Sequence, residues 1–397
     1  MSNQTATDNT TDLPAFPGKR EARCPFAPPS EYTDWRAKDG LQRVERKGEL
    51  VWAASRFEDV RTVLSDPRIS AALPEDEGSP AAFPGMDDPE HARLRMMLTR
   101  DFSVKRVQQM RPHIQGLVDD ILETMISKGS SADLVRDYAL PIPSLVISLL
   151  LGVPYADHGF FQDKGGALLD TRITKQERDA VLGELLGYLG ELVERKEREP
   201  ADDLLSRLVT ERVQTGQLSR EMAAMNGVLL LIAGHETTSN MISLSTLVLL
   251  QDPEQLTRIR DTEDPAVIKN AVEELLRYTT IAQDQIMRVA AEDVTVGGQL
   301  IRAGDLIVAN LPSGNRDEAI FTDPDTLDID RNTRGHLAFG YGVHQCLGQN
   351  LARAELEIAL PTLLRRLPGL KLAVPMEQIR FRDEMVTYGP HELPVTW

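Results

Sequence analysis

Hydrophobic residues recur at helical spacing through a long middle part of the chain, residues 104–251. Glycine and proline interrupt this pattern near 129–130, 141–143 and 152–154, where breaks between helices are expected. The stretch 170–200 is charged and amphipathic, which predicts a helix lying on the surface. The pattern therefore indicates a mainly α-helical protein.

The most hydrophobic helical segment covers residues 219–251 and is followed by Pro253. A helix of about thirty residues would span roughly 50 Å. Most of it is apolar on all sides, which is typical of a helix that runs through a core. About twenty apolar residues could instead span a membrane, but the polar block 234–240, Gly-His-Glu-Thr-Thr-Ser-Asn, makes bilayer insertion costly. We expect a buried core helix with a polar notch.

Alternation of apolar and polar residues, which is typical of β-strands, is confined to shorter segments. A short strand is predicted near residues 50–53, followed by a helix that ends at Asp66-Pro67. Residues 286–310 form short alternating strands around a Gly297-Gly298 turn, and residues 380–397 resemble a last hairpin. The expected fold class is mainly α with a smaller β region.

The organisation of the chain is simple. Residues 1–20 are polar and Thr-rich, and we expect them to be poorly ordered. No internal repeat or dividing linker is visible, so residues 1–397 are predicted to form a single domain. The N-terminus has no basic segment followed by an apolar one, so neither a signal peptide nor a membrane anchor is expected, and the predicted location is cytoplasmic.

Composition excludes several functional classes. Lys+Arg number 44 against 61 Asp+Glu, giving a net charge of −17, which argues against nucleic-acid or anionic-membrane binding. The two cysteines, Cys24 and Cys346, allow no disulfide framework and no zinc site built from cysteines. Hydrophobic and charged contents of 41% and 26% are those of an ordinary globular protein.

Cys346 is the first candidate for chemistry. It lies in a glycine-rich loop, FGYGVHQCLG, and leucines at helical spacing predict that a helix begins directly after it. Unpaired N–H groups at a helix start favour a thiolate, which a soft metal or haem iron requires as ligand. An isolated cysteine is more often an ordinary buried residue than a metal ligand. The identity and spacing of the residues around Cys346 therefore distinguish the two alternatives.

The polar notch of the central helix is the second candidate. His235-Glu236 matches the start of the zinc-protease motif H-E-x-x-H, but Ser239 stands where the second histidine is required, which excludes that site. Thr237 could instead hold a bound oxygen by a hydrogen bond while Glu236 relays protons from solvent. Gly234 is expected to loosen the local helix hydrogen bonds. Such polar residues could alternatively bond only to backbone carbonyls of their own helix.

Four motifs in order resemble those of the cytochrome P-450 monooxygenases. They are His-x-x-x-Arg at 91–95, Ala-Gly-x-Glu-Thr at 233–237, Glu-x-x-Arg at 274–277 and Phe-x-x-Gly-x-x-x-Cys-x-Gly at 339–348. The resemblance covers nearly the whole chain and is closest to bacterial enzymes of actinomycete secondary metabolism. It implies the cytochrome P-450 fold, with the long helix over a haem, and an enzyme that hydroxylates or epoxidises its substrate with O2 and two electrons.

The resemblance also assigns roles to residues. Cys346 would be the axial iron ligand of a haem b, and Glu236 and Thr237 would deliver protons to bound oxygen. The haem propionates would be bound by polar side chains, and the remaining cofactor-binding positions would line the haem: His91, Arg95, Ala233, Gly234, Arg288, Phe339, Gly340, His344 and Gly348. Glu274, Arg277 and Arg331 would form a buried structural network that fixes the segment carrying the thiolate.

Partners and substrate follow from the same resemblance. Electrons would come from a separate ferredoxin and its reductase, docked on a basic patch of Arg100, Lys105, Arg106 and Arg111, so turnover should fall as ionic strength rises. The substrate would be a hydrophobic small molecule such as a polyketide or macrolide, and the protein a monomer. Its pocket would be formed by the 70–89 loop, lid helices within 155–200, and four residues: Ile281, Ala282, Val386 and Thr387.

Other haem proteins remain as alternatives. A haem-based sensor or carrier of the same fold would bind gas without turnover, and a peroxide-driven enzyme would use the same cofactor. Neither needs the Glu236-Thr237 pair, which favours the monooxygenase.

Overall fold

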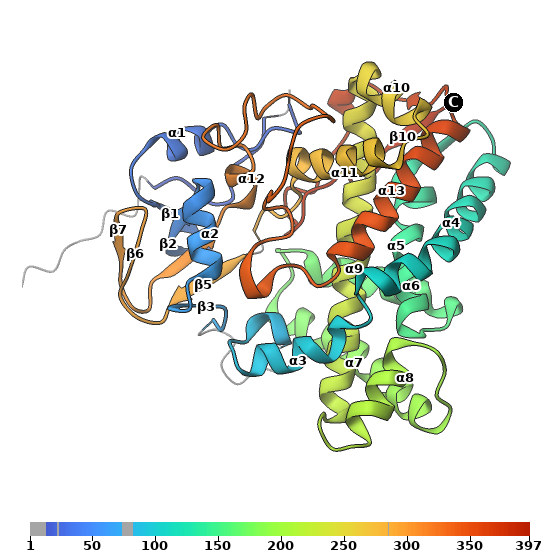
Figure 1. Cartoon of the computed structure of the whole chain (residues 1–397), viewed down its shortest axis with the longest axis horizontal. Helices are drawn as coiled ribbons and strands as arrows, with labels where there is room; N and C mark the ends of the chain where they lie inside the picture. Colours follow the sequence, from blue (N-terminus) through green and yellow to red (C-terminus); the bar gives the residue numbers. More distant parts are fainter. Residues whose placement is uncertain (1–12, 22–23, 74–81, 285) are drawn as a thin grey trace, which may run out of the picture.

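The computed structural model describes residues 13–397 apart from 22–23, 74–81 and 285. Most strands gather at one side of the molecule and most helices at the other, with α9 running through the helical part (Figure 1). The helices in chain order are α1 (Glu31–Ala37), α2 (Phe57–Ser65), α3 (Glu90–Thr99), α4 (Val104–Ser127), α5 (Pro141–Leu151), α6 (His158–Leu169), α7 (Lys175–Arg198), α8 (Leu204–Leu208), α9 (Arg220–Gln251), α10 (Pro253–Asp261), α11 (Pro265–Thr279), α12 (Leu311–Gly314) and α13 (Gln349–Arg366).

The central helix has the predicted form. Residues Arg220–Gln251 make one helix of 32 residues, which begins where the Ser219 side chain accepts a hydrogen bond from the Met222 N–H. It packs against α5, α6, α7 and α13, which explains why its sequence is apolar on all sides. The helix is continuous through Gly234, so the expected loosening there is wrong. A Cβ at that position would lie 3.1 Å from Ile147, so glycine permits close packing of α5 instead.

The helical segments before α9 begin and end largely where glycine and proline predicted. Gly152 ends α5 in a left-handed conformation with φ 79°. The break predicted near 141–143 falls at the start of α5, because the preceding helical segment ends at Ala139. Pro141 and Pro143 lie in the first turn of α5, where a missing N–H costs no hydrogen bond. α7 begins with a capping box between Thr174 and Glu177.

Strands form the smaller β region. They are β1 (Gln42–Arg46), β2 (Glu49–Ala54), β3 (Ile69–Ser70), β4 (Ser131–Asp133), β5 (Met287–Ala290), β6 (Val294–Val296), β7 (Gln299–Ile301), β8 (Leu306–Ala309), β9 (Lys371–Leu372) and β10 (Pro394–Thr396). The largest sheet has the order β1-β2-β8-β5-β3, with β2 and β8 parallel and the other pairs antiparallel. β6 and β7 form the predicted hairpin, whose turn residues Gly297 and Gly298 both have positive φ.

The N-terminal prediction is wrong for residues 13–20. Phe16 is buried against Tyr32, and its N–H donates to the Glu45 carbonyl of β1. Arg20 lies 4.0 Å from the centre of the Tyr388 ring. These aromatic and backbone contacts hold the segment on the sheet, and a polar composition does not reveal them. Residues 1–12 lie outside the described part.

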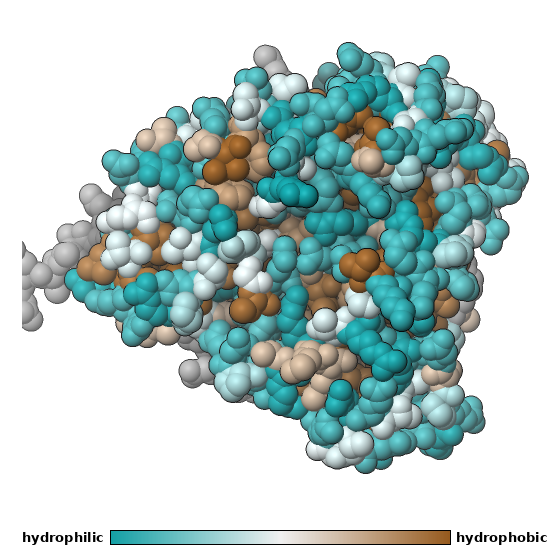
Figure 2. Space-filling model, in the orientation of Figure 1, coloured by the Kyte–Doolittle hydropathy of each residue, from teal (hydrophilic) through white to brown (hydrophobic). Residues whose placement is uncertain are grey.

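No helix of the described residues is long and apolar enough to cross a membrane. The face in Figure 2 is mostly hydrophilic, with small separate hydrophobic patches. The main hydrophobic core lies between α9 and the helices around it, and two smaller cores lie beside the sheet.

Candidate active site

A cavity of about 280 Å³ lies between α9, the loop 338–348 and the start of α13. Its walls are mainly apolar, formed among others by Phe83, Ile147, Leu230, Ile281, Ala282 and Leu351. Cys346 lines it from the loop before α13, and Thr237 lines it from α9. A cavity of this kind suits an apolar ligand with a few polar contacts.

The loop before α13 presents Cys346 to this cavity. The Cys346 N–H donates to the Phe339 carbonyl (2.9 Å), which closes the loop, and Gly348 is the residue from which α13 begins. Gly340 and Gly342 have φ of 71° and 74°, which favours glycine, and a Cβ at Gly342 would lie 2.6 Å from the Leu64 carbonyl oxygen. The glycines therefore permit the tight turn.

Two opposing influences act on the pKa of the Cys346 thiol. Burial raises the pKa of the Cys346 thiol above its usual value, while the N–H groups of Gly348 and Gln349 and the charges of Arg95 and Arg353 lower it. The helix start acts in the predicted direction but is outweighed by burial. A metal cation bonded to the sulfur would supply the charge that favours the thiolate.

The opposite wall is the notch of α9. Ala233, Gly234 and Thr237 line the cavity. The Thr237 hydroxyl donates to the Ala233 carbonyl at 2.6 Å, which is the backbone bond that sequence reasoning left open. Because its proton is engaged there, the hydroxyl oxygen faces cavity groups as a hydrogen-bond acceptor.

Glu236 has a partner that sequence reasoning missed. Its buried carboxylate forms an ion pair with Arg382, from the segment before β10. Arg382 also lies 3.5 Å from the Asn240 side-chain oxygen, one helical turn along α9. Burial lowers the pKa of Arg382, although Glu384 and Asp133 oppose this shift. The partners lie far apart in sequence, so no local pattern could have identified the pair.

Glu355 is a second carboxyl group that the sequence did not indicate. It lines the cavity from α13 and is buried. Its Oε2 atom has no partner among the described residues, and burial raises the pKa of Glu355 well above its usual value. Burial therefore favours the uncharged form of this carboxyl group.

Basic and imidazole groups converge at one edge of the cavity. Arg95, Arg288 and His344 line it, and the rings of His344 and His91 lie 4.0 Å apart. Burial, reinforced by His91 and Arg288, lowers the pKa of His344 to about 4. Arg95 donates to the Gln345 carbonyl (2.5 Å), and Arg288 donates to the Met287 carbonyl (2.8 Å).

These groups fit a flat iron cofactor that carries carboxylates. The Nε2 atom of His91 and the Nδ1 atom of His344 are buried without a partner among the described residues, as expected of groups that bind an anion. Arg95 and Arg288 add positive charge at the same edge, and the Cys346 sulfur supplies a soft ligand at the cavity wall. The donor set therefore agrees with a haem.

The structure also brings together Glu274, Arg277 and Arg331. Arg277 donates two bonds to Glu274 (2.7 and 2.8 Å), and Arg331 donates one (3.2 Å). The side chains of Glu274 and Arg277 are fully buried. The two arginines also bind carbonyls between Asn315 and Thr326, so the network fixes the segment that precedes the Cys346 loop.

The structure places only part of the predicted pocket residues at the cavity wall. Ile281 and Ala282 line the cavity, but Val386 and Thr387 do not. Thr387 is buried, bonds to Asn240 and pairs with Ala282, while the Val386 carbonyl accepts bonds from the Gln283 and Asp284 N–H groups. Both residues attach the C-terminal segment to α9 and to the stretch after α11.

The loop and lid expectations are also only partly met. Phe83 and Pro84 of the 70–89 loop line the cavity, whereas residues 74–81 lie outside the described part. The described residues of α6 and α7 pack on α9 and contribute no side chain to the cavity wall.

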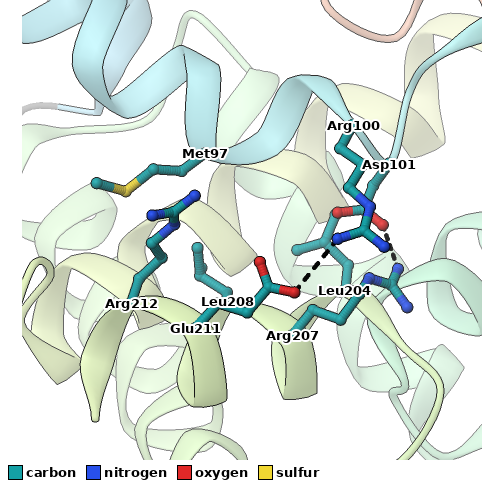
Figure 3. Close-up of a pocket in the computed structure, with 8 residues that line it drawn as sticks. All are labelled: Met97, Arg100, Asp101, Leu204, Arg207, Leu208, Glu211 and Arg212. Atoms are coloured by element: carbon teal, nitrogen blue, oxygen red, sulfur yellow. Dashed lines mark hydrogen bonds and ion pairs between the residues drawn. The ribbon is translucent and has the colours of Figure 1, made fainter. Parts of the chain in front are cut away.

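Three arginines of the predicted ferredoxin-binding patch form ion pairs with acidic side chains. Arg100 pairs with Glu211 (3.3 Å), Arg106 with Asp202 (3.7 Å) and Arg111 with Glu357 (2.7 Å). Figure 3 shows the Arg100–Glu211 pair beside a second one, Arg207–Asp101, which join the residues after α3 to α8 and the helical turn that follows it. Acidic side chains of the net-negative chain therefore cancel most of this positive charge.

Comparisons with known proteins agree with the site. The family model described as Cytochrome P450 matches residues 167–368. Cytochrome P450-SU2 of Streptomyces griseolus is 50% identical over 399 residues, covering 97% of this chain and 98% of that protein. Pentalenic acid synthase of Streptomyces avermitilis is 46% identical over 396 residues, covering 96% and 97%. The crystal structure of the mycinamicin VIII C21 methyl hydroxylase MycCI from Micromonospora griseorubida, bound to mycinamicin VIII, is 40% identical, with a TM-score of 0.91 and coverage of 97% and 100%.

Proposed function

The chain belongs to the cytochrome P450 family and is a P450 monooxygenase, and we propose that it hydroxylates or epoxidises a bulky hydrophobic small molecule with O2 and two electrons from a ferredoxin. The observation that supports this most directly is the cavity itself. Cys346 of the loop and Thr237 of α9 both line a mainly apolar space that Arg95, Arg288 and His344 also line.

The family implies a haem, and we propose haem b with Cys346 as its axial ligand. Arg95, Arg288, His344 and His91 bind its propionates, since two of these groups carry buried nitrogen atoms without protein partners. Bound there, the haem supplies the binding and reductive cleavage of O2, which a thiolate ligand favours. The small residues Ala233 and Gly234 line the same cavity and would leave room for it.

The chain's own residues then handle the protons. The Thr237 hydroxyl donates its hydrogen bond to the Ala233 carbonyl. Its oxygen therefore accepts a hydrogen bond from a water or a protonated group in the cavity. Glu236 lies one residue earlier on α9 and is held by Arg382, away from the apolar ligand space. Protons enter along this pair while the apolar walls exclude bulk water.

The substrate class follows from the cavity lining. Phe83, Ile147, Leu230, Ile281 and Ala282 offer apolar contact, which favours a polyketide or macrolide skeleton over a charged metabolite. One similar protein is bound to mycinamicin VIII and another is a pentalenic acid synthase, and both names agree with secondary metabolism.

Electrons are proposed to enter beside the Cys346 loop. Met96 of α3 and Val343 of the loop are exposed large hydrophobic residues, and Arg95 links the two segments through Gln345. We propose that a ferredoxin, itself reduced by a ferredoxin reductase, docks there on a monomer of this protein. Because the basic patch is compensated, turnover limited by ferredoxin should depend only weakly on ionic strength, and a steep decrease would contradict this docking mode.

The decisive experiment is spectroscopic. The purified protein, loaded with haem, reduced and given carbon monoxide, should show the absorption band diagnostic of a sulfur-ligated haem. Absence of that band would overturn the proposal. Hydrophobic compounds that shift the haem absorption band on binding would then be tested for turnover with ferredoxin and its reductase.

A further inference from the structure

A second ion-pair network lies next to the one that contains Glu274. Glu273 accepts two bonds from Arg353 of α13 (2.5 and 3.0 Å), and its Oε2 atom lies 3.0 Å from His336 Nε2. We refer to Glu273, His336 and Arg353 as the Glu273 clamp. Consecutive residues of α11 thus supply carboxylates to two different networks.

The Glu273 clamp encloses an aromatic ring of the cysteine loop. The guanidinium of Arg353 lies 4.5 Å from the centre of the Phe339 ring, and the His336 ring lies 6.0 Å from it. The Ala338 N–H donates to His336 Nδ1 at 3.1 Å, which fixes the backbone next to Phe339. Since the Phe339 carbonyl accepts from the Cys346 N–H, a shift of Phe339 would also move the cysteine.

The clamp is charged. Burial would raise the pKa of Glu273, but hydrogen bonds from His336 and Arg353 outweigh it and lower this pKa to about 2, so the carboxylate is ionised. Arg353 is one of two arginines whose charge acts on the Cys346 sulfur. Glu273 therefore partly cancels a positive charge that the sulfur experiences.

We propose that Glu273 is a positioning residue for the iron-ligating sulfur, which it serves by holding Arg353 and His336 around Phe339 and by balancing the charge of Arg353. This rests on the proposed function, in which Cys346 binds haem iron. Glu274 fixes the segment ahead of the loop, whereas Glu273 sets the electrostatic surroundings of the ligand itself. An uncompensated cation near the thiolate stabilises the reduced iron, and removal of that cation has the opposite effect.

The test measures the reduction potential of the haem-loaded protein and its ferrous–carbon monoxide spectrum. Glu273→Gln should shift the potential to more positive values and reduce the share of the sulfur-ligated band. Arg353→Gln should shift the potential in the opposite direction. The double variant Glu273→Gln/Arg353→Gln should return toward the parent value, because both charges are absent.

Glu357→Gln is the matched control. It removes the carboxylate of another pair between α13 and an arginine, Arg111, that does not contact Phe339. It should leave both the potential and the spectrum unchanged.

Three outcomes decide the inference. Shifts of opposite sign in the two single variants support it, and a merely structural role would not produce them. Unchanged potentials, or shifts of the same sign, overturn it even if the variants unfold more easily. If Glu273→Gln does not fold, Arg353→Gln alone still decides by the sign of its shift. A parent protein without the sulfur-ligated band would instead overturn the proposed function.

Discussion

The two walls of the cavity are built in different ways. The sulfur wall is local in sequence: residues 339–348 contain the ring, the turn glycines, the cysteine and the helix start. The α9 wall depends on a remote partner, because the Glu236 carboxylate is held by Arg382 and the nearby Thr387 bonds to Asn240. Ligation is therefore encoded in one short segment, whereas the position of the acid depends on long-range folding.

Replacing Cys346 tests the sulfur wall and should have the largest effect. Cys346→Ala should abolish the sulfur-ligated carbon monoxide band and all monooxygenase turnover, because no other side chain at that position offers a thiolate. Cys24→Ala is the control, since Cys24 is absent from the cavity wall, and it should behave as the parent. A persisting band in Cys346→Ala would disprove the role of this wall.

Thr237→Ala should leave the Cys346 loop unchanged and remove only the hydroxyl group of the α9 wall. We expect product formation to decrease by about 10²-fold, in line with the usual contribution of positioned proton-transfer groups. Oxygen consumption should continue, with peroxide released in place of product. Thr237→Ser, which keeps the hydroxyl, should retain most coupling, and equal coupling in both variants would contradict the assignment.

Arg382→Gln tests whether the remote partner matters. Product formation should decrease less than in Thr237→Ala because the hydroxyl remains, and the solvent deuterium isotope effect on turnover should increase as proton supply becomes limiting. Arg380→Gln changes an exposed arginine of the same segment and is the control. An isotope effect equal in both variants would show that the ion pair does not serve proton delivery.

Two further variants compare how much a buried ion pair and an exposed ion pair contribute to stability. Arg277→Gln leaves the fully buried Glu274 carboxylate without its main partner and should lower the free energy of unfolding by about 3–5 kcal/mol. Arg100→Gln breaks an exposed pair with Glu211 and should cost about 0–1 kcal/mol. Denaturant unfolding of both variants measures the difference, and similar costs would show that burial does not govern these pairs.

Sequence reasoning succeeded where a feature depends on neighbouring residues. The core position of α9, the helix start after Cys346 and the contact of Glu274 with Arg277 follow from apolar periodicity, from glycine positions and from helical spacing. The mainly helical fold with a smaller sheet is also confirmed by solved structures with a TM-score of about 0.9.

It failed where a partner comes from a distant segment. Glu236 with Arg382, and Glu273 with His336 and Arg353, meet only after folding. The compensated basic patch failed for the same reason, because Glu211, Asp202 and Glu357 lie elsewhere in the chain. Val386 and Thr387 do not line the cavity because pairing with a distant segment, such as that of Thr387 with Ala282, decides where their side chains lie.

The consecutive carboxylates of α11 have a mechanical consequence. Successive residues of a helix point about 100° apart around its axis, so Glu273 and Glu274 fix the axial rotation of α11 from two directions. A mutation that turned this helix slightly would strain both networks together. The haem ligand and the segment ahead of it should therefore respond as one unit to changes in the hydrophobic face of α11, even when the altered residue touches neither.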